Sequence, residues 1–239
     1  MRITAIMSTY NEREYLPLKL AWCKANGLDL YVCDNMSSDG TWEMLQDEGI
    51  KSHQYDTNGI FSEKLMQNEI KKTLANINPE WVLYMGCDLF FNLPMLPMGY
   101  NCFTFQFLSA KYTGENREPS NPFMNFTHGM IHQRLKFLFK YSPDIIWNGD
   151  EIVIPNELCF DLDHIVINYG DTKTFEQRNE TLIRRQRAWD SGIDNSGHGE
   201  HLRTGKEIQW YWNKSELQDF TKNIWYDIQI NQIARQAGC

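Results

Sequence analysis

The sequence predicts an α/β fold with a mixed, mostly parallel sheet flanked by helices. Two short apolar runs, residues 3–8 and 29–33, each end in a polar cluster. Buried parallel strands that deliver polar groups at their carboxyl ends have this pattern. A third run, residues 81–85, is apolar throughout and is expected to be a central strand. Helix-like segments separate these runs, so the first part of the chain alternates strand and helix as a doubly wound sheet does.

The helices between these strands carry recognisable start and stop signals. Pro17 is tolerated in a first helical turn, and Gly27 is a typical C-terminal stop. Ser38 or Asp39 is expected to cap the second helix, and Ser62 the third. The three helices are expected at residues 14–26, 41–47 and 62–77, with a short strand at residues 50–55.

The second half of the chain is less regular. Residues 129–141 alternate basic and apolar side chains, which suits either a helix or a strand. Residues 174–189 predict a helix with Arg and Gln on its exposed positions, and a capping box at residues 215–218 predicts the start of a C-terminal helix. Further strands are expected at residues 100–108 and 165–169, and loops at residues 112–127 and 190–207, the latter a candidate lid.

Composition limits the class of protein and its setting. A formal net charge of −8 argues against a broad electrostatic grip on nucleic acid. The six cysteines are scattered without a CxxC pair, which in a chain of this size indicates reduced thiols in the cytoplasm. Neither a signal-peptide pattern nor an apolar run of about 18 residues occurs. We therefore expect a soluble cytoplasmic protein, in the host cytoplasm if the chain is viral.

The polar clusters at the strand ends are the candidate ligand-binding groups. In open α/β sheets ligands bind at the carboxyl ends of strands, so one pocket is expected between residues 9–12 and the pair Asp34 and Asn35. These groups can hydrogen-bond a base and a ribose. The alternative is that the pair only starts a turn and that residues 38–41 only cap a helix. Asp88 follows the central strand, where a carboxylate can bind Mg²⁺ or Mn²⁺.

Several runs together resemble one enzyme family. The runs MSTYNEREYLPLKLAW, VCDNMSSDGTWEML and QNEI…PEWVLYMGCDLFFNLP resemble the nucleotide-sugar-binding half of family 2 glycosyltransferases, which have the Rossmann-like GT-A fold. The runs RLKFLFKYSPDIIWNGDEIVIP and IVINYGDTKTFEQRNETLI are similar to later segments of one branch of that family. The resemblance covers residues 1–185. It implies one continuous GT-A domain, with a donor-binding half at residues 1–105 and an acceptor-binding half with C-terminal helices at residues 106–239.

The resemblance also implies roles for individual residues. The nucleoside and other parts of the substrate would be held by residues of the first three runs, and the diphosphate by two basic side chains. A divalent cation (Mn²⁺ or Mg²⁺) would be bound by an aspartate, an asparagine and a histidine, and a carboxylate base would take the acceptor proton. The candidates for binding the nucleoside and substrate are Thr9, Tyr10, Asn11, Glu12, Asp34 and Asn68, and those for the diphosphate are Lys173 and Arg178. The candidates for the cation are Asp88, Asn168 and His164. The base would be Glu151 or Asp150, with Glu151 preferred by its position in the family pattern.

The chain departs from the family pattern at two positions. Gly86 stands where the first aspartate of the metal motif is expected, and Asn168 stands where the branch has a histidine. An asparagine can still ligate a cation through its carbonyl oxygen, and His164 lies close by in the sequence. These departures leave open whether the reaction depends on a metal.

The expected function is transfer of a hexose or pentose from a nucleoside-diphosphate sugar, with UDP as the expected nucleotide, to an acceptor hydroxyl, with inversion and metal assistance. The acceptor is a glycan, a small molecule or a hydroxymethylated base in DNA. If the acceptor is DNA, five basic side chains could contact its phosphates: Lys111, Arg117, Arg134, Lys136 and Lys140. The competing hypotheses are a catalytically silent nucleotide-sugar-binding module and an unrelated α/β nucleotidyltransferase.

Overall fold

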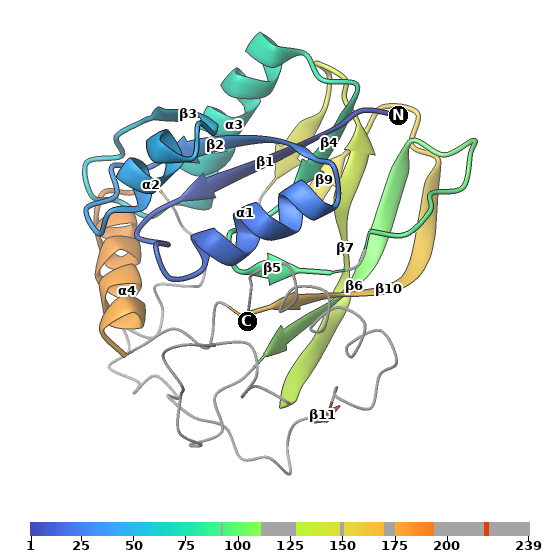
Figure 1. Ribbon diagram of the computed structural model, residues 1–239. Coiled ribbons are helices and arrows are strands. Elements are labelled where there is room, and N and C mark those ends of the chain that lie inside the picture. The colour runs from blue at the N-terminus through green and yellow to red at the C-terminus, as the bar shows by residue number, and fades with distance from the viewer. Residues whose placement is uncertain (92, 111–127, 149–150, 170–174, 194–217, 220–239) are drawn as a thin grey trace.

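The computed structural model describes residues 1–91, 93–110, 128–148, 151–169, 175–193 and 218–219 (Figure 1). A nine-stranded mixed sheet forms its centre, in the order β3-β2-β1-β4-β7-β6-β10-β5, with β11 paired to β7. Helices pack against this sheet, and a separate two-stranded pair, β8 and β9, lies beside it. The predicted α/β fold with a mixed sheet is therefore confirmed.

The first half of the chain follows the prediction closely. Its four strands are parallel to one another and pair in continuous register. Each helix begins and ends within two residues of the expected position. The elements are β1 (Ile3–Thr9), α1 (Leu16–Ala25), β2 (Asp29–Asp34), α2 (Thr41–Asp47), β3 (Lys51–Gln54), α3 (Glu63–Ile77) and β4 (Trp81–Tyr84).

Two helix starts test the predicted caps. Ser62 caps α3 as expected, since its Oγ accepts a hydrogen bond from the Leu65 amide at 3.4 Å. The predicted cap of α2 is wrong: Gly40 occupies the N-cap position, and Asp39 lies one residue earlier. Gly40 has φ 93°, and a Cβ there would lie 2.0 Å from a guanidinium nitrogen of Arg13. The positive φ favours glycine at this position, and the Arg13 side chain would have to move to admit a Cβ.

The second half departs further from the prediction. Residues 129–141, left open between helix and strand, form the long strand β7, and the strand expected at residues 165–169 begins much earlier. The C-terminal helix is wrong at Gln218–Asp219, which form β11; the rest of that segment lies outside the described residues. The elements are β5 (Leu89–Phe90), β6 (Cys102–Ala110), β7 (His128–Lys140), β8 (Ile146–Asn148), β9 (Glu151–Val153), β10 (Cys159–Asn168), α4 (Phe175–Asp190) and β11 (Gln218–Asp219).

The sheet is buried on both faces, and β1 shows how. Alternate side chains of a strand point to opposite faces. Met7 accordingly lies in one core cluster with Trp22 of α1, and Ile6 lies in a second cluster with Ile70 and Leu74 of α3. The central strands are therefore shielded from water on both sides, which explains why their sequences are apolar throughout.

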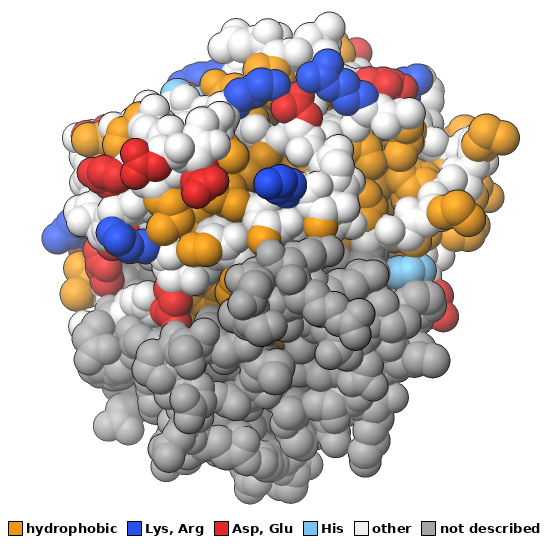
Figure 2. Space-filling model, in the orientation of Figure 1, with side chains coloured by type: hydrophobic (Ala, Val, Ile, Leu, Met, Phe, Trp, Pro, Cys, Tyr) orange, Lys and Arg blue, Asp and Glu red, His pale blue; other side chains and the backbone are white. Residues whose placement is uncertain are grey.

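The surface carries charges of both signs. On the face shown in Figure 2, basic and acidic side chains are interspersed over the described part of the molecule. This distribution agrees with a chain that has 23 basic and 31 acidic side chains and a formal net charge of −8.

Among the described residues, no helix is both long and apolar enough to cross a lipid bilayer.

Candidate functional site

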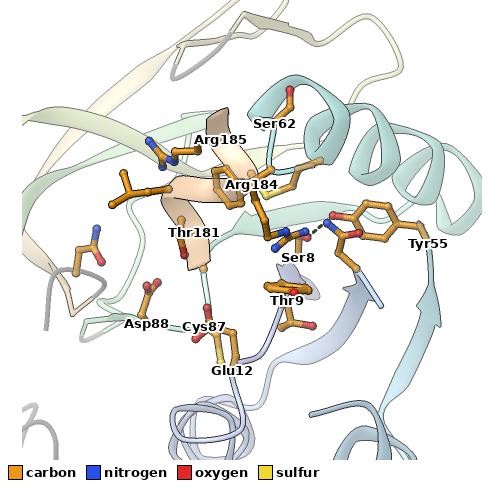
Figure 3. Close-up of a pocket in the computed structure, with 17 residues that line it drawn as sticks. Ser8, Thr9, Glu12, Tyr55, Ser62, Cys87, Asp88, Thr181, Arg184 and Arg185 are labelled. Carbon is orange, nitrogen blue, oxygen red and sulfur yellow. Dashed lines mark hydrogen bonds between the residues drawn. The ribbon is translucent and has the colours of Figure 1, made fainter. Parts of the chain in front are cut away.

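A pocket of about 400 Å³ opens at the carboxyl ends of the parallel strands (Figure 3). Ser8 and Thr9 line it from β1, Asn35 from the residue after β2, and Gly86 and Asp88 from the turn after β4. The strand β1 has β2 on one side and β4 on the other, so the winding of the sheet reverses there. Such reversal points are where open α/β sheets bind ligands.

The predicted residue Asp34 lies beneath this pocket and does not line it. Its carboxylate is fully buried and accepts bonds from the Oγ1 of Thr9 at 3.1 Å, the amide of Ser37 at 3.0 Å, the Oγ of Ser37 at 2.5 Å and the Nε2 of Gln54 at 3.2 Å. Four donors satisfy the buried charge. Asp34 therefore ties the ends of β1, β2 and β3 together.

Residues 37–41 hold the loop after β1 in place. The amide of Asn11 donates to the Ser37 hydroxyl at 2.9 Å, and its side-chain oxygen accepts from the Ser38 amide at 2.9 Å. The amide of Glu12 donates to the Thr41 hydroxyl at 2.9 Å. The polar run after β2 thus forms a turn and the start of α2, which is the alternative considered from the sequence. Through these hydrogen bonds it also sets the position of Glu12 at the pocket.

Asp88 and Asn168 meet at the far end of the pocket. Asn168 pairs with Leu89 in the β10–β5 ladder, and the Tyr169 amide donates to the Asp88 carbonyl at 2.9 Å. A Cβ at Gly86 would lie 2.7 Å from Asp88 Oδ1, so the glycine leaves space for the Asp88 carboxylate. One carboxylate and one carboxamide, both oxygen donors, therefore line the same pocket on neighbouring stretches of backbone, and oxygen donors are the ligands that a hard cation prefers.

Asp88 and Asn168 also line a second pocket of about 280 Å³. This neighbouring pocket includes Ile152 of β9, the strand to which Glu151 also belongs. The two polar side chains therefore stand between two hollows, one at the strand ends and one beside β9.

The helix α1 supports the segment that carries Asp88. The Nζ of Lys19, which is fully buried, donates to the Leu89 carbonyl and lies 4.2 Å from the Phe90 ring centroid. The Nε1 of Trp22 donates to the Phe91 carbonyl at 2.9 Å. Burial lowers the pKa of Lys19. One local signal could have indicated this role, because Lys19 lies between Leu16 and Trp22 on the inner side of a helix.

The helix α4 forms the opposite wall of the pocket, and Figure 3 shows Arg184 and Arg185 projecting from it. The Arg184 side chain is 3 % exposed, and its guanidinium carbon lies 3.3 Å from the Tyr10 ring centroid. The expectation that the arginines of this helix are exposed is therefore wrong for Arg184. The Tyr10 hydroxyl donates to Glu180 at 2.6 Å, and burial together with this bond raises the pKa of Tyr10. Sequence reasoning missed both arginines of the wall.

The structure brings only some of the candidate residues together. The pocket lining includes Thr9, Tyr10, Glu12, Asp88 and Asn168. Asn11 and Asp34 act behind the lining, through the bonds described above.

The remaining candidates lie elsewhere or outside the described residues. Asn68 is exposed on α3 and lines a separate hollow beside Lys72. His164 precedes Asn168 by four residues on β10 and does not line the pocket; burial lowers its pKa. The backbones of Glu151 and Arg178 belong to β9 and α4. Asp150 and Lys173 fall outside the described residues, as do residues 194–207 of the expected loop.

Comparison with known proteins gives structural likenesses only. No protein-family model matches the chain, and no curated protein matches it. The structure of Staphylococcus aureus TarS 1–349 in complex with UDP is 13% identical and covers 87% of this chain and 76% of that chain, with a TM-score of 0.44. The complex of TarS 1–349 with UDP-GlcNAc is 21% identical, covers 53% of this chain and 42% of that chain, and has a TM-score of 0.37.

A structure of a different enzyme class is also similar. The CTP:phosphocholine cytidylyltransferase LicC of Streptococcus pneumoniae is 11% identical and covers 88% of this chain and 89% of that chain, with a TM-score of 0.34. All three TM-scores lie below 0.5.

Proposed function

We propose that the chain is a GT-A-type glycosyltransferase that transfers a sugar from a nucleoside-diphosphate sugar to an acceptor hydroxyl. One observation carries the proposal. Around a single pocket at the reversal point of the sheet stand a carboxylate, Asp88, a carboxamide, Asn168, and two guanidinium groups, Arg184 and Arg185. Aromatic rings complete the lining, so the pocket combines the groups that a nucleobase, a diphosphate and a cation each need.

The parts of the donor have separate places in this proposal. Tyr55 borders the pocket at the end away from Asp88, where a base would lie, and Phe61 also lines the pocket. Arg184 and Arg185 face the diphosphate and stabilise the charge that develops on it as the leaving group departs. UDP is the nucleotide proposed first.

Asp88 and Asn168 would hold a divalent cation, Mn²⁺ or Mg²⁺. Their donor set fits, because both ions prefer oxygen ligands and keep open positions for water and phosphate oxygens. When bound, the cation supplies positive charge next to the diphosphate. Asp88 alone brings a full negative charge to this set, since Gly86 replaces a second aspartate.

The acceptor side lies toward β9 in this proposal. The acceptor oxygen attacks the anomeric carbon while the bond from that carbon to the diphosphate oxygen breaks, and a carboxylate takes the hydroxyl proton. Glu151 is the proposed base, with Asp150 as the alternative. The second pocket supports this arrangement, because it joins Asp88 and Asn168 to Ile152, the neighbour of Glu151.

A glycan or a small molecule is favoured as the acceptor over a modified base in DNA. Two of the basic side chains counted for DNA already bind within the protein. Arg134 donates to the Leu162 carbonyl at 2.6 Å, and Lys136 donates to Glu157 at 2.7 Å. Lys111 and Arg117 lie outside the described residues.

A silent nucleotide-sugar-binding module is the second candidate. Arg184 covers one face of the Tyr10 ring, which would otherwise be open to a base. Gly86 also leaves the cation site with fewer carboxylates than the family pattern has. Both features would weaken donor binding and turnover.

The test is a panel of UDP-, GDP-, CDP- and dTDP-sugars, each with and without Mn²⁺, read by thermal shift and by release of the nucleoside diphosphate. We expect one donor to stabilise the protein in a Mn²⁺-dependent way and to be hydrolysed slowly. Asp88→Asn should lower this release by about 100-fold, whereas Asp47→Asn, an exposed aspartate on α2, should leave it unchanged.

The other outcomes separate the competing functions. Stabilisation without turnover supports the binding module. Pyrophosphate release from a nucleoside triphosphate supports a nucleotidyltransferase. A panel without any thermal shift contradicts donor binding altogether.

A further inference from the structure

Two cysteines face each other at the start of two neighbouring strands. Cys102 opens β6 and Cys159 opens β10, and the two residues are direct partners in the parallel ladder between these strands. Their sulfur atoms lie 3.2 Å apart as free thiols. Cys159 precedes Asn168 by nine positions on β10, which places the pair on the order of 25 Å from the donor pocket.

We propose that Cys102 and Cys159 are a dithiol modification site, which closes to a disulfide in exchange with a small-molecule disulfide such as oxidised glutathione. The proposal is independent of the proposed function, because neither cysteine lines either pocket described above.

The backbone geometry permits the bond. Directly paired residues on neighbouring strands have Cα atoms about 5 Å apart, within the range of about 4.4–6.8 Å that disulfides span. Both side chains point to the same face of the sheet, where Cys102 is part of the core cluster and Cys159 packs against it. The sulfurs need to approach by only about 1 Å to reach the bonding distance of about 2.05 Å.

The two thiols differ in access, which sets the order of the steps. Cys102 is buried and Cys159 is half-buried. The Cys159 thiolate attacks one sulfur of oxidised glutathione, and a first glutathione thiolate leaves. The Cys102 thiolate then attacks the Cys159 sulfur of the mixed disulfide and releases the second. The protein loses two electrons and two protons, and two glutathione thiols form.

Two charged residues beside the sulfur atoms, Glu157 and Lys136, decide between disulfide formation and metal binding at this site. Glu157 could join the two sulfurs as a third ligand, since all three donor atoms lie within 4.8 Å of one another. Its carboxylate, however, accepts a bond from the Lys136 ammonium at 2.7 Å. A cation bound there would meet the lysine charge, so disulfide formation is favoured over metal binding. Burial raises the pKa of both thiols, so the exchange should be faster at alkaline pH than at neutral pH.

The bond would stabilise the fold. It would join positions 57 residues apart in the chain, and closing a long loop restricts the unfolded state. We expect the melting temperature of the oxidised protein to rise by roughly 5–15 °C. Donor binding should be the same in both forms, because the pair lies far from the donor pocket.

The experiment uses the full chain with Cys239→Ser, which removes the cysteine nearest the C-terminus. The folded protein is incubated with oxidised glutathione, blocked with N-ethylmaleimide, and analysed by intact mass and peptide mapping. We expect the loss of two thiols, one cross-linked peptide pair containing Cys102 and Cys159, and the rise in melting temperature.

Matched variants make the result decisive. With Cys102→Ser, Cys159 should stop at a single glutathione adduct and the melting temperature should not rise; with Cys159→Ser, the buried Cys102 should remain a free thiol. The mapping of the parent protein does not depend on either variant folding. The proposal is overturned if both thiols stay free under conditions that oxidise exposed dithiols, if either cysteine pairs elsewhere, or if one equivalent of Zn²⁺ binds and requires both cysteines.

Discussion

The two halves of the sheet differ in how their strands find their partners. In the first half, β1 to β4 are joined by helices and pair in continuous parallel register. In the second half, the ladders of β6 with β7 and with β10 contain register shifts. The strand β7 joins the halves, because it pairs antiparallel with both β4 and β6.

This difference explains which elements local sequence predicted. A strand followed by a covering helix shows two periodicities and capping signals within a short window. The strand β10 pairs with β6 and β5, which lie far earlier in the chain, and β7 pairs with β4 as well as with the preceding strand β6. The pattern at residues 129–141 was therefore ambiguous, and the first part of β10 was missed, until the partner strands were known.

The two halves nevertheless share one core, and the largest predicted effect tests this. Phe105 on β6 is fully buried, with its ring 5.0 Å from that of Phe91, in the cluster that also contains Met7. Phe105→Ala should lower the free energy of unfolding by about 3–5 kcal/mol through the cavity that it leaves. Urea unfolding followed by circular dichroism should still show one transition.

The matched control for this variant is Met98→Ala, at a side chain that is 96% exposed, which should change stability by less than about 0.5 kcal/mol. Two separate transitions, with only one of them shifted by Phe105→Ala, would show that the halves unfold independently.

The next largest effect concerns the polar network of the first half. Asp34→Ala removes the acceptor of one buried and three partly buried hydrogen bonds, and their donors lose this partner. We expect a loss of about 2–4 kcal/mol in chemical denaturation. Asp47→Ala, at an exposed position, should be nearly neutral. A small effect of Asp34→Ala would mean that the strand ends do not depend on this carboxylate.

The contact of α4 with the first half predicts an effect on ligand binding. If Arg184 binds the donor diphosphate, Arg184→Ala should weaken donor affinity about tenfold, corresponding to about 1.4 kcal/mol. Arg187→Ala removes the same charge from an exposed position of the same helix and should have little effect. Isothermal titration with the donor found in the panel measures both variants. Tighter binding to Arg184→Ala would instead identify Arg184 as an obstacle on Tyr10.

The smallest effect lies at the other end of the first half. A hydrogen bond from Lys51, with a second from Arg2, lowers the pKa of Asp29, and both pairs are partly exposed. A depressed pKa contributes stability that is present above the unfolded value of about 3.9 and is lost as the pH falls through the folded value.

Asp29→Asn should therefore cost about 0.5 kcal/mol at neutral pH, reduced by solvent screening. The difference from the parent protein should shrink as the pH falls below about 4. Thermal unfolding of both proteins at pH 7 and at pH 3 measures it. A difference that persists unchanged at the lower pH would assign the effect to something other than the charge of Asp29.

The candidate site divides in the same way as the fold. Thr9, Tyr10, Glu12 and Asp88 could be predicted because each lies at, or a few residues beyond, the carboxyl end of an apolar strand. Asp34 was also predicted to bind the ligand, but it lies beneath the pocket. The sequence alone does not distinguish a carboxylate that lines a pocket from one whose oxygens accept hydrogen bonds from neighbouring strand ends. Arg184 was read as exposed, because nothing local indicates that α4 packs against Tyr10.

The sequence by itself determined the α/β class, the order of the first seven elements and the strand ends at which polar groups gather. These follow from short-range periodicity and from residues with special backbone preferences. Only the tertiary structure decided which carboxylate faces the pocket, which helix forms its second wall and which cysteines meet. Each of those depends on contacts between residues distant in the chain, whose pairing is fixed by the packing of the whole sheet.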